Sequence, residues 1–170
     1  MVNILFVCLG DTCRSPMACA IMEHKLKVKG FGNKARVSSA GISTNSGECT
    51  ALIALEALRE FGIEAKSHNS TQLTLDILEK SDIVITATEE IKLAILKVYP
   101  NKKKIRSFSD FIEGEELLDP YGKGRGQYLK LAKQLYSDMD TVIKLMIEER
   151  ILVWRLQLGQ TMAGLVLKNT

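Results

Sequence analysis

The sequence predicts a single α/β domain in which a mostly parallel, four-stranded sheet is doubly wound and flanked by helices. Three observations favour this fold. Short apolar runs rich in branched residues alternate four times with segments of helical periodicity. No linker, internal repeat or low-complexity segment divides the 170 residues. Because 46% of the residues are apolar, the chain has enough apolar side chains for one substantial core.

Four short runs are predicted to be the strands of this sheet. The first has the compact apolar composition of a strand buried on both faces, and the second is stopped by Gly41. The predicted strands are residues 3–7, 36–39, 82–86 and 104–107.

Capping residues and glycines mark the predicted helices. The first helix is expected to start at Ser15 and Pro16, because serine suits the N-cap and proline the first helical position. It is expected to end near Gly30, and Thr88 is the predicted cap of a later helix that stops before Pro100. The other predicted helices cover residues 51–61, include 75–78, and run from about 126 with an apolar face of Leu131, Leu135, Met139, Val142 and Met146.

The chain is expected to consist of one folded domain and a short extension. Residues 1–150 form the predicted domain. The apolar pattern of residues 151–170 fits either a continued helix or an extended edge. We expect this extension to pack on the same domain, because apolar residues are usually buried.

Composition excludes several classes of protein. The formal charge is only +3, which is too small to indicate nucleic-acid binding or attachment to a membrane surface. The apolar run at residues 2–7 is too short for a signal peptide, so we expect a cytoplasmic protein. All four cysteines lie in the first third of the chain, and three of them lie within twelve positions. In a cytoplasmic chain, such clustering indicates metal binding, redox chemistry or catalysis.

The loop after the first predicted strand contains a cysteine followed, after five residues, by arginine and serine. In a doubly wound sheet, ligands bind at the carboxyl ends of the strands. Backbone N–H groups at the start of a helix bind an oxyanion and favour the thiolate form of Cys8. The planar guanidinium of Arg14 can hold two phosphoryl oxygens, and Ser15 can donate to the thiolate. The sequence therefore predicts a phosphate-binding loop that contains a nucleophile.

This loop, read as Cys8–Pro16, resembles the signature of the low molecular weight protein tyrosine phosphatases. A second motif of that family, Asp-Pro-aromatic, occurs as Asp119-Pro120-Tyr121, and Ser39 and His68 also lie where the family has them. The resemblance covers about residues 2–150 and implies the family's flavodoxin-like topology.

The resemblance also implies a reaction and a set of site residues. Cys8 would attack phosphorus to form a cysteinyl-phosphate, Arg14 would hold the phosphoryl oxygens, and Asp119 would act first as acid and then as base. The substrates would be phosphorylated proteins, the product inorganic phosphate, and no metal or other cofactor would be required. A monomer or weak dimer is expected. Ser39 and His68 would support the loop, and the other residues implied to bind phosphate or substrate are Leu9, Gly10, Asp11, Thr12, Cys13, Ser15, Asn45 and Tyr121.

Two departures from the family pattern bear on activity and specificity. Asp11 stands where the family usually has asparagine, and a carboxylate about 7 Å from a bound dianion would cost on the order of 2 kcal/mol per unit charge. We expect Asp11 to be protonated or bound by His68 or another donor, or the enzyme to be weaker. Thr12 replaces a branched aliphatic residue, which resembles the protein arginine phosphatase branch. A hydroxyl can accept a hydrogen bond from a guanidinium, so phosphoarginine is slightly favoured over phosphotyrosine.

Two other functions remain as alternatives at this stage. Arsenate reductase on the same scaffold uses further cysteines in the middle of the chain, whereas no cysteine follows Cys49 here. A non-catalytic phosphate-binding module would be favoured if Cys8, Arg14 or Asp119 were missing, and all three are present.

Overall fold

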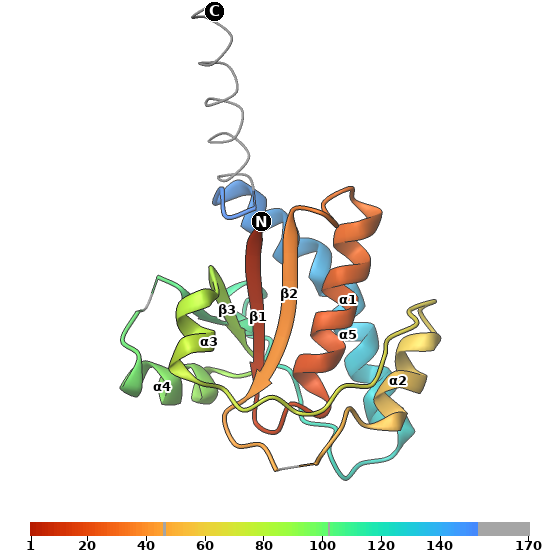
Figure 1. The fold of residues 1–170 in the computed structure, drawn as a ribbon. Helices are drawn as coiled ribbons and strands as arrows, with labels where there is room; N and C mark the ends of the chain where they lie inside the picture. The colour runs from red at the N-terminus through yellow and green to blue at the C-terminus, as the bar shows by residue number, and fades with distance from the viewer. Residues whose placement is uncertain (46, 102, 153–170) are drawn as a thin grey trace, which may run out of the picture.

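The central sheet consists of four parallel strands in the order β2-β1-β3-β4 (Figure 1). The computed structural model describes residues 1–45, 47–101 and 103–152. Each predicted run overlaps a strand: the first two strands extend beyond the predicted residues at both ends, and the last two each begin one residue later than predicted. The strands are β1 (Val2–Cys8), β2 (Ala35–Gly41), β3 (Ile83–Thr86) and β4 (Ile105–Ser107).

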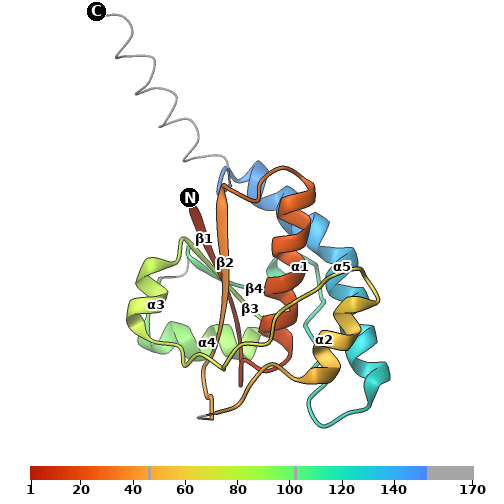
Figure 2. The same cartoon turned by 45° about the vertical axis from the view of Figure 1, so that its right-hand side comes forward.

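Helices cover both faces of this sheet, as the alternation of strands and helices predicts. Two views agree that α1, α2 and α5 lie on one face and that α3 and α4 lie on the other (Figures 1 and 2). The predicted doubly wound α/β fold is therefore confirmed. The helices are α1 (Arg14–Val28), α2 (Leu52–Arg59), α3 (Leu75–Lys80), α4 (Glu89–Val98), the 3₁₀ turn η1 (Phe108–Asp110) and α5 (Arg125–Glu148).

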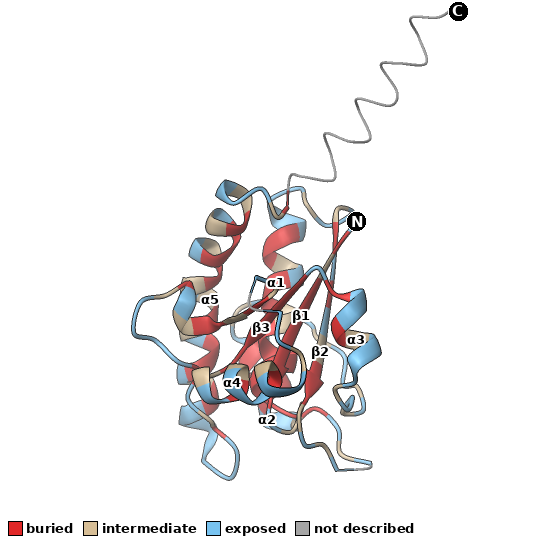
Figure 3. Ribbon diagram, turned by 90° about the vertical axis from the view of Figure 1, so that its left-hand side faces the viewer, coloured by how far each residue is buried: buried red, intermediate tan, exposed pale blue. Residues whose placement is uncertain are grey.

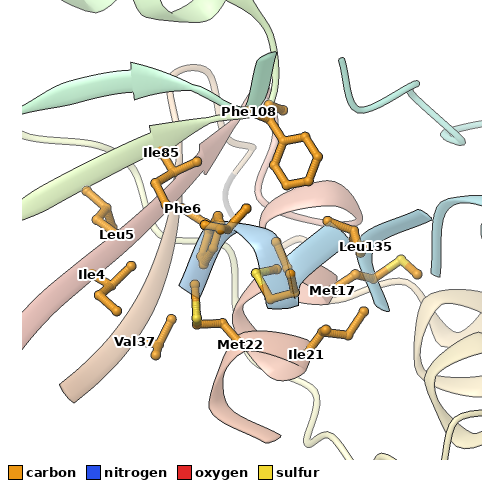
Figure 4. Packing of buried hydrophobic residues seen from close by; sticks show 14 of the residues in the cluster. Ile4, Leu5, Phe6, Met17, Ile21, Met22, Val37, Ile85, Phe108 and Leu135 are labelled. Atoms are coloured by element: carbon orange, nitrogen blue, oxygen red, sulfur yellow. The ribbon is translucent and has the colours of Figure 1, made fainter. Parts of the chain in front are cut away.

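Strand β1 runs through the centre of the core. It pairs with β2 on one side and β3 on the other, and Ile4 and Leu5 on its opposite faces are both fully buried. Met17 of α1 and Leu135 of α5 cover one face of the sheet beside Phe6 (Figure 4). Burial is concentrated on the strands and the inward faces of the helices (Figure 3). The strand that carries Cys8 at its end is thus held on every side.

The predicted caps have different outcomes. Thr88 is the N-cap of α4, and its hydroxyl accepts a hydrogen bond from the Ile91 N–H at 3.3 Å, as expected. The prediction that Ser15 caps α1 is wrong, because α1 begins at Arg14 with Cys13 as its N-cap. The hydroxyl of Ser15 instead lies within hydrogen-bond distance of Cys8 and Asp11. Its side chain therefore takes part in the loop after β1 and does not cap the helix.

The C-terminal extension lies almost entirely outside the described residues. Helix α5 ends at Glu148, and Leu152 is buried among core side chains. Packing on the domain is predicted for residues 151–170, and residues 153–170 lie outside the described residues. Within the described ranges, no helix combines the length and apolarity that a membrane crossing requires.

The end of β2 lies very close to the loop that follows β1. Gly41 pairs with Cys8 in the parallel register, and its N–H donates to the carbonyl of Thr71 at 2.9 Å. A Cβ atom on Gly41 would lie 2.7 Å from the Leu9 carbonyl oxygen and 2.9 Å from the Asp11 nitrogen. Neither backbone atom can move without deforming the loop, so this position requires glycine.

We predict that Gly41→Ala destabilises the fold by roughly 1–3 kcal/mol, the usual cost of forcing a methyl group into a packed region. The urea midpoint of unfolding measures this cost. The matched control is Gly126→Ala in the first turn of α5, where an added Cβ meets nothing within 4 Å. Because alanine is the better helix former, the control should unfold at an equal or higher urea concentration. Equal midpoints for Gly41→Ala and wild type would contradict the prediction.

Candidate active site

A pocket of about 180 Å³ opens at the carboxyl end of β1. It brings together the three predicted catalytic residues, although Arg14 and Asp119 are 105 positions apart in the chain. Leu9 and Tyr121 are 49% and 63% exposed, so they form outer walls of the pocket. The complete lining is Cys8, Leu9, Gly10, Thr12, Cys13, Arg14, Ser43, Asn45, Glu48, Asp119 and Tyr121.

The sulfur of Cys8 lies at the base of this pocket and is almost completely buried, since the residue is only 2% exposed. The backbone N–H of Asp11 donates to the sulfur at 3.2 Å, and the hydroxyl oxygen of Ser15 lies 3.0 Å away. Asp11 adopts a left-handed conformation with φ of 55°, which Asp and Asn tolerate better than most residues. This turn directs the loop back over the sulfur.

Arg14 and Asp119 form an ion pair within the pocket. Arg14 Nη2 donates to Asp119 Oδ2, and Arg14 is 7% exposed. Asp119 Oδ1 accepts a hydrogen bond from the Tyr121 N–H at 3.1 Å, and its side chain is 43% exposed. The guanidinium is therefore fixed at the start of α1, while the carboxylate lies at the rim, where it can exchange protons with solvent.

The carboxylate of Asp11 does not line the pocket. It is completely buried and accepts hydrogen bonds from the Ser15 hydroxyl at 2.8 Å and the Thr71 N–H at 2.9 Å. Ser15 bonds to Oδ1 and Thr71 to Oδ2, and His68 Nε2 lies 3.1 Å from the same Oδ2 and 3.3 Å from the Ser39 hydroxyl. Of the three possibilities for Asp11, the one in which His68 and other donors bind it is therefore observed. The hydrogen bond to Asp11 raises the pKa of His68.

Cys13 links the loop to α5. Its sulfur lies 3.3 Å from the hydroxyl of Tyr128 and 3.5 Å from that of Thr12. Burial raises the pKa of the Cys13 thiol, so this cysteine carries no charge near neutral pH. Sequence reasoning did not single out Tyr128, which is one more position on the apolar face of a long helix.

Two pocket residues, Ser43 and Glu48, were also missed by sequence reasoning. Both belong to the irregular segment after β2, where no periodicity or motif indicates which side chains face the site. Asn45, which was predicted, lines the pocket and donates to Glu48 Oε1 at 3.0 Å. The pocket wall thus carries a second carboxylate besides Asp119.

No cluster of three or more His, Cys, Asp or Glu side chains that could hold a metal ion occurs in the part of the chain that the structure describes. The polar groups of the pocket are instead two thiols, one guanidinium, one amide, hydroxyls and carboxylates. This set can bind an oxyanion, attack an electrophilic centre and transfer a proton.

Known proteins are similar to this chain in both sequence and fold. The family described as low molecular weight phosphotyrosine protein phosphatase matches residues 3–151. A protein-arginine-phosphatase of Geobacillus stearothermophilus is 37% identical over 123 residues, which are 71% of this chain and 79% of that protein.

Two solved structures show the same fold. A Cys-to-Ser mutant of the YwlE arginine phosphatase, with a phosphorylated active-site serine, superposes with a TM-score of 0.81 at 29% identity. This match covers 89% of the present chain and 99% of the other. A low molecular weight protein tyrosine phosphatase from T. tengcongensis superposes with a TM-score of 0.78 at 33% identity, covering 85% of this chain and 99% of that one. The chain therefore belongs to the low molecular weight phosphotyrosine protein phosphatase family.

Proposed function

We propose that this protein hydrolyses phosphorylated proteins through a covalent intermediate on Cys8 and that phosphoarginine is its preferred substrate. One observation carries the proposal: a buried thiol, a fixed guanidinium and a partly exposed carboxylate share one small pocket at a helix N-terminus. Each group suits one task of phosphoryl transfer. The thiol supplies a nucleophile, the guanidinium binds the charged oxygens, and the carboxylate handles the proton.

In the first step, the Cys8 thiolate attacks phosphorus as the bond to the leaving group breaks. The incoming phosphoryl group competes with Asp119 for the guanidinium of Arg14, because both are anions. A carboxylate that has lost its cationic partner and lies beside a dianion favours its protonated form. Asp119 can then donate that proton to the departing atom, and Cys8 carries the phosphoryl group.

In the second step, water attacks the cysteinyl-phosphate and inorganic phosphate leaves. Asp119 has now lost its proton, so it accepts one from the attacking water and returns to its starting form. Arg14 holds the phosphoryl oxygens in both steps. The phosphorylated active-site serine of the related YwlE mutant supports a covalent route, since a serine in the nucleophile's place retained the phosphoryl group.

The polar lining of the pocket supports phosphoarginine. The leaving group of phosphoarginine is a guanidinium with several N–H donors, which would be costly to bury without acceptors. Thr12, at 8% exposure, supplies a hydroxyl at the loop, and Glu48 supplies a carboxylate from the facing segment. Asp119 adds a second negative charge. Tyr121 could stack on a phenyl ring or a guanidinium, so it favours neither substrate.

We predict that Cys8→Ser abolishes turnover and that Arg14→Lys lowers kcat/KM strongly, because an ammonium cannot hold two phosphoryl oxygens in a planar fork. Release of p-nitrophenol from p-nitrophenyl phosphate measures both. Arg59→Lys is a matched control, since Arg59 is exposed and pairs only with Glu64 in the described structure. More than trace turnover by Cys8→Ser would exclude the covalent mechanism. A wild-type protein that binds phosphate without turnover would favour the phosphate-binding module.

We predict that Asp119→Ala slows the first step by roughly 10²–10⁴-fold, the usual contribution of a general acid. The loss should shrink for p-nitrophenyl phosphate, whose leaving group departs without a proton. The measurement compares kcat/KM of wild type and Asp119→Ala on a series of aryl phosphates of rising leaving-group basicity. An equal loss across the series would show that Asp119 does not protonate the leaving group.

We predict that Thr12→Ile shifts the ratio of kcat/KM for phosphoarginine over phosphotyrosine at least tenfold toward phosphotyrosine, about 1.4 kcal/mol. Glu48→Gln should shift the same ratio in the same direction, because it removes a charge that attracts the cationic leaving group. Glu64→Gln removes an equal charge outside the pocket and should leave the ratio unchanged. Unchanged ratios for both pocket variants would favour phosphotyrosine as the substrate.

A further inference from the structure

The hydroxyl of Ser15 lies between two acidic groups. Its oxygen is 3.0 Å from Cys8 Sγ and 2.8 Å from Asp11 Oδ1, and all three residues are buried. The carbonyl of Ala40 is a more distant acceptor at 3.4 Å. A serine hydroxyl has one proton, so it can donate to only one of these groups at a time.

Cys8, Ser15 and Asp11 form a hydrogen-bonded row, and the number of protons that they share limits the protonation states of this row. If Cys8 and Asp11 were both ionised, one anion would face the lone pairs of Ser15 without a proton between them. Such an arrangement is unfavourable in a buried site, where unpaired charges are costly. One additional proton satisfies the whole row. It can reside on Cys8, which then donates to Ser15 while Ser15 donates to Asp11, or it can reside on Asp11, with both hydrogen bonds reversed.

We propose that Cys8 and Asp11 share one dissociable proton through Ser15, and that the reactive form of the protein carries this proton on Asp11. Conversion to the reactive form breaks the Cys8 S–H bond and transfers that proton to Ser15 Oγ. The original Ser15 proton passes to Asp11 Oδ1. No proton is gained or lost, and the net charge of the row stays at −1. This inference concerns the ionisation of Cys8 and rests on its proposed role as the nucleophile.

The surroundings of Asp11 accommodate its neutral form. The second carboxyl oxygen still accepts from the Thr71 N–H and from His68 Nε2. His68 Nδ1 lies 3.0 Å from the Thr50 hydroxyl, which can donate to it when the imidazole is neutral. With the proton on Asp11, the single negative charge of these three residues lies on the Cys8 sulfur. The reactive form therefore lacks the second negative charge that an ionised Asp11 would place beside a phosphoryl group.

Other titratable groups near the row set its pH dependence. The hydrogen bond to Asp11 raises the pKa of His68, so protonation of His68 favours ionised Asp11 and leaves the shared proton on Cys8. Burial raises the pKa of Cys19 on α1 to about 12, and Asp11 contributes to this shift, so Cys19 remains a neutral thiol. On the pocket side, Cys13 is neutral and Arg14 is paired with Asp119. Mild acid thus favours the unreactive form through His68.

The test is Asp11→Asn, which has the same shape but cannot take up the proton. Its amide donates permanently to Ser15, so Ser15 always donates to Cys8. We expect the pH of half-maximal alkylation of Cys8 by iodoacetamide to fall by at least one unit. Below that pH, the alkylation rate should rise about tenfold, which corresponds to about 1.4 kcal/mol. Because the tryptic peptide of residues 1–14 contains both Cys8 and Cys13, fragment-ion mass spectrometry assigns the alkylation to Cys8. Thermal unfolding confirms that the variant is folded.

The same substitution in a Ser15→Ala background distinguishes proton sharing from simple removal of a charge. We expect Asp11→Asn to shift the alkylation profile there by less than a third of its effect in the presence of Ser15. An equal shift in both backgrounds, or no shift when Ser15 is present, would overturn the proposal. Because alkylation needs no substrate, the outcome does not depend on whether the protein is a phosphatase.

Discussion

The rest of the site depends on the hydrogen bonds of the buried Asp11 carboxylate. It joins three segments that are far apart in the sequence: the loop after β1, the first turn of α1 through Ser15, and the segment that contains His68 and Thr71. The left-handed backbone at the same residue turns the loop so that its own N–H donates to Cys8. One residue therefore fixes the backbone conformation of the loop and the positions of Ser15 and Cys8 together.

The proposed catalytic groups are held with unequal rigidity, and this inequality suits their tasks. Cys8 ends the central strand β1, and Arg14 begins a helix that packs against that strand, so both are fixed by the core. Asp119 lies in an irregular segment and is half-buried. A nucleophile and an anion-binding group need fixed positions, whereas a group that exchanges protons with water needs access to solvent. The fold provides both.

The sequence allowed the fold and much of the pocket to be predicted, because these depend on local patterns. Alternating apolar runs located the strands, and the spacing of Cys8 and Arg14 located the loop. Glu48 and Tyr128 were missed because their roles depend on which segments meet in space. The capping role predicted for Ser15 was wrong for a related reason, since its hydroxyl bonds to groups that the loop brings near. Local propensity cannot anticipate a tertiary partner.

The close approach of residues 71–73 to Gly41 has a consequence for self-association. Strand β2 is an edge strand of the sheet, and at its carboxyl end Gly41 is hydrogen-bonded to Thr71 and Leu73. Exposed edge strands can pair with other chains and start aggregation, so residues 71–73 protect this end of β2. The same segment also donates to Asp11 through the Thr71 N–H. Local opening of residues 71–73 would therefore expose an unpaired strand edge and loosen the loop that carries Cys8 in one event, so that loss of the pocket geometry and aggregation would occur together.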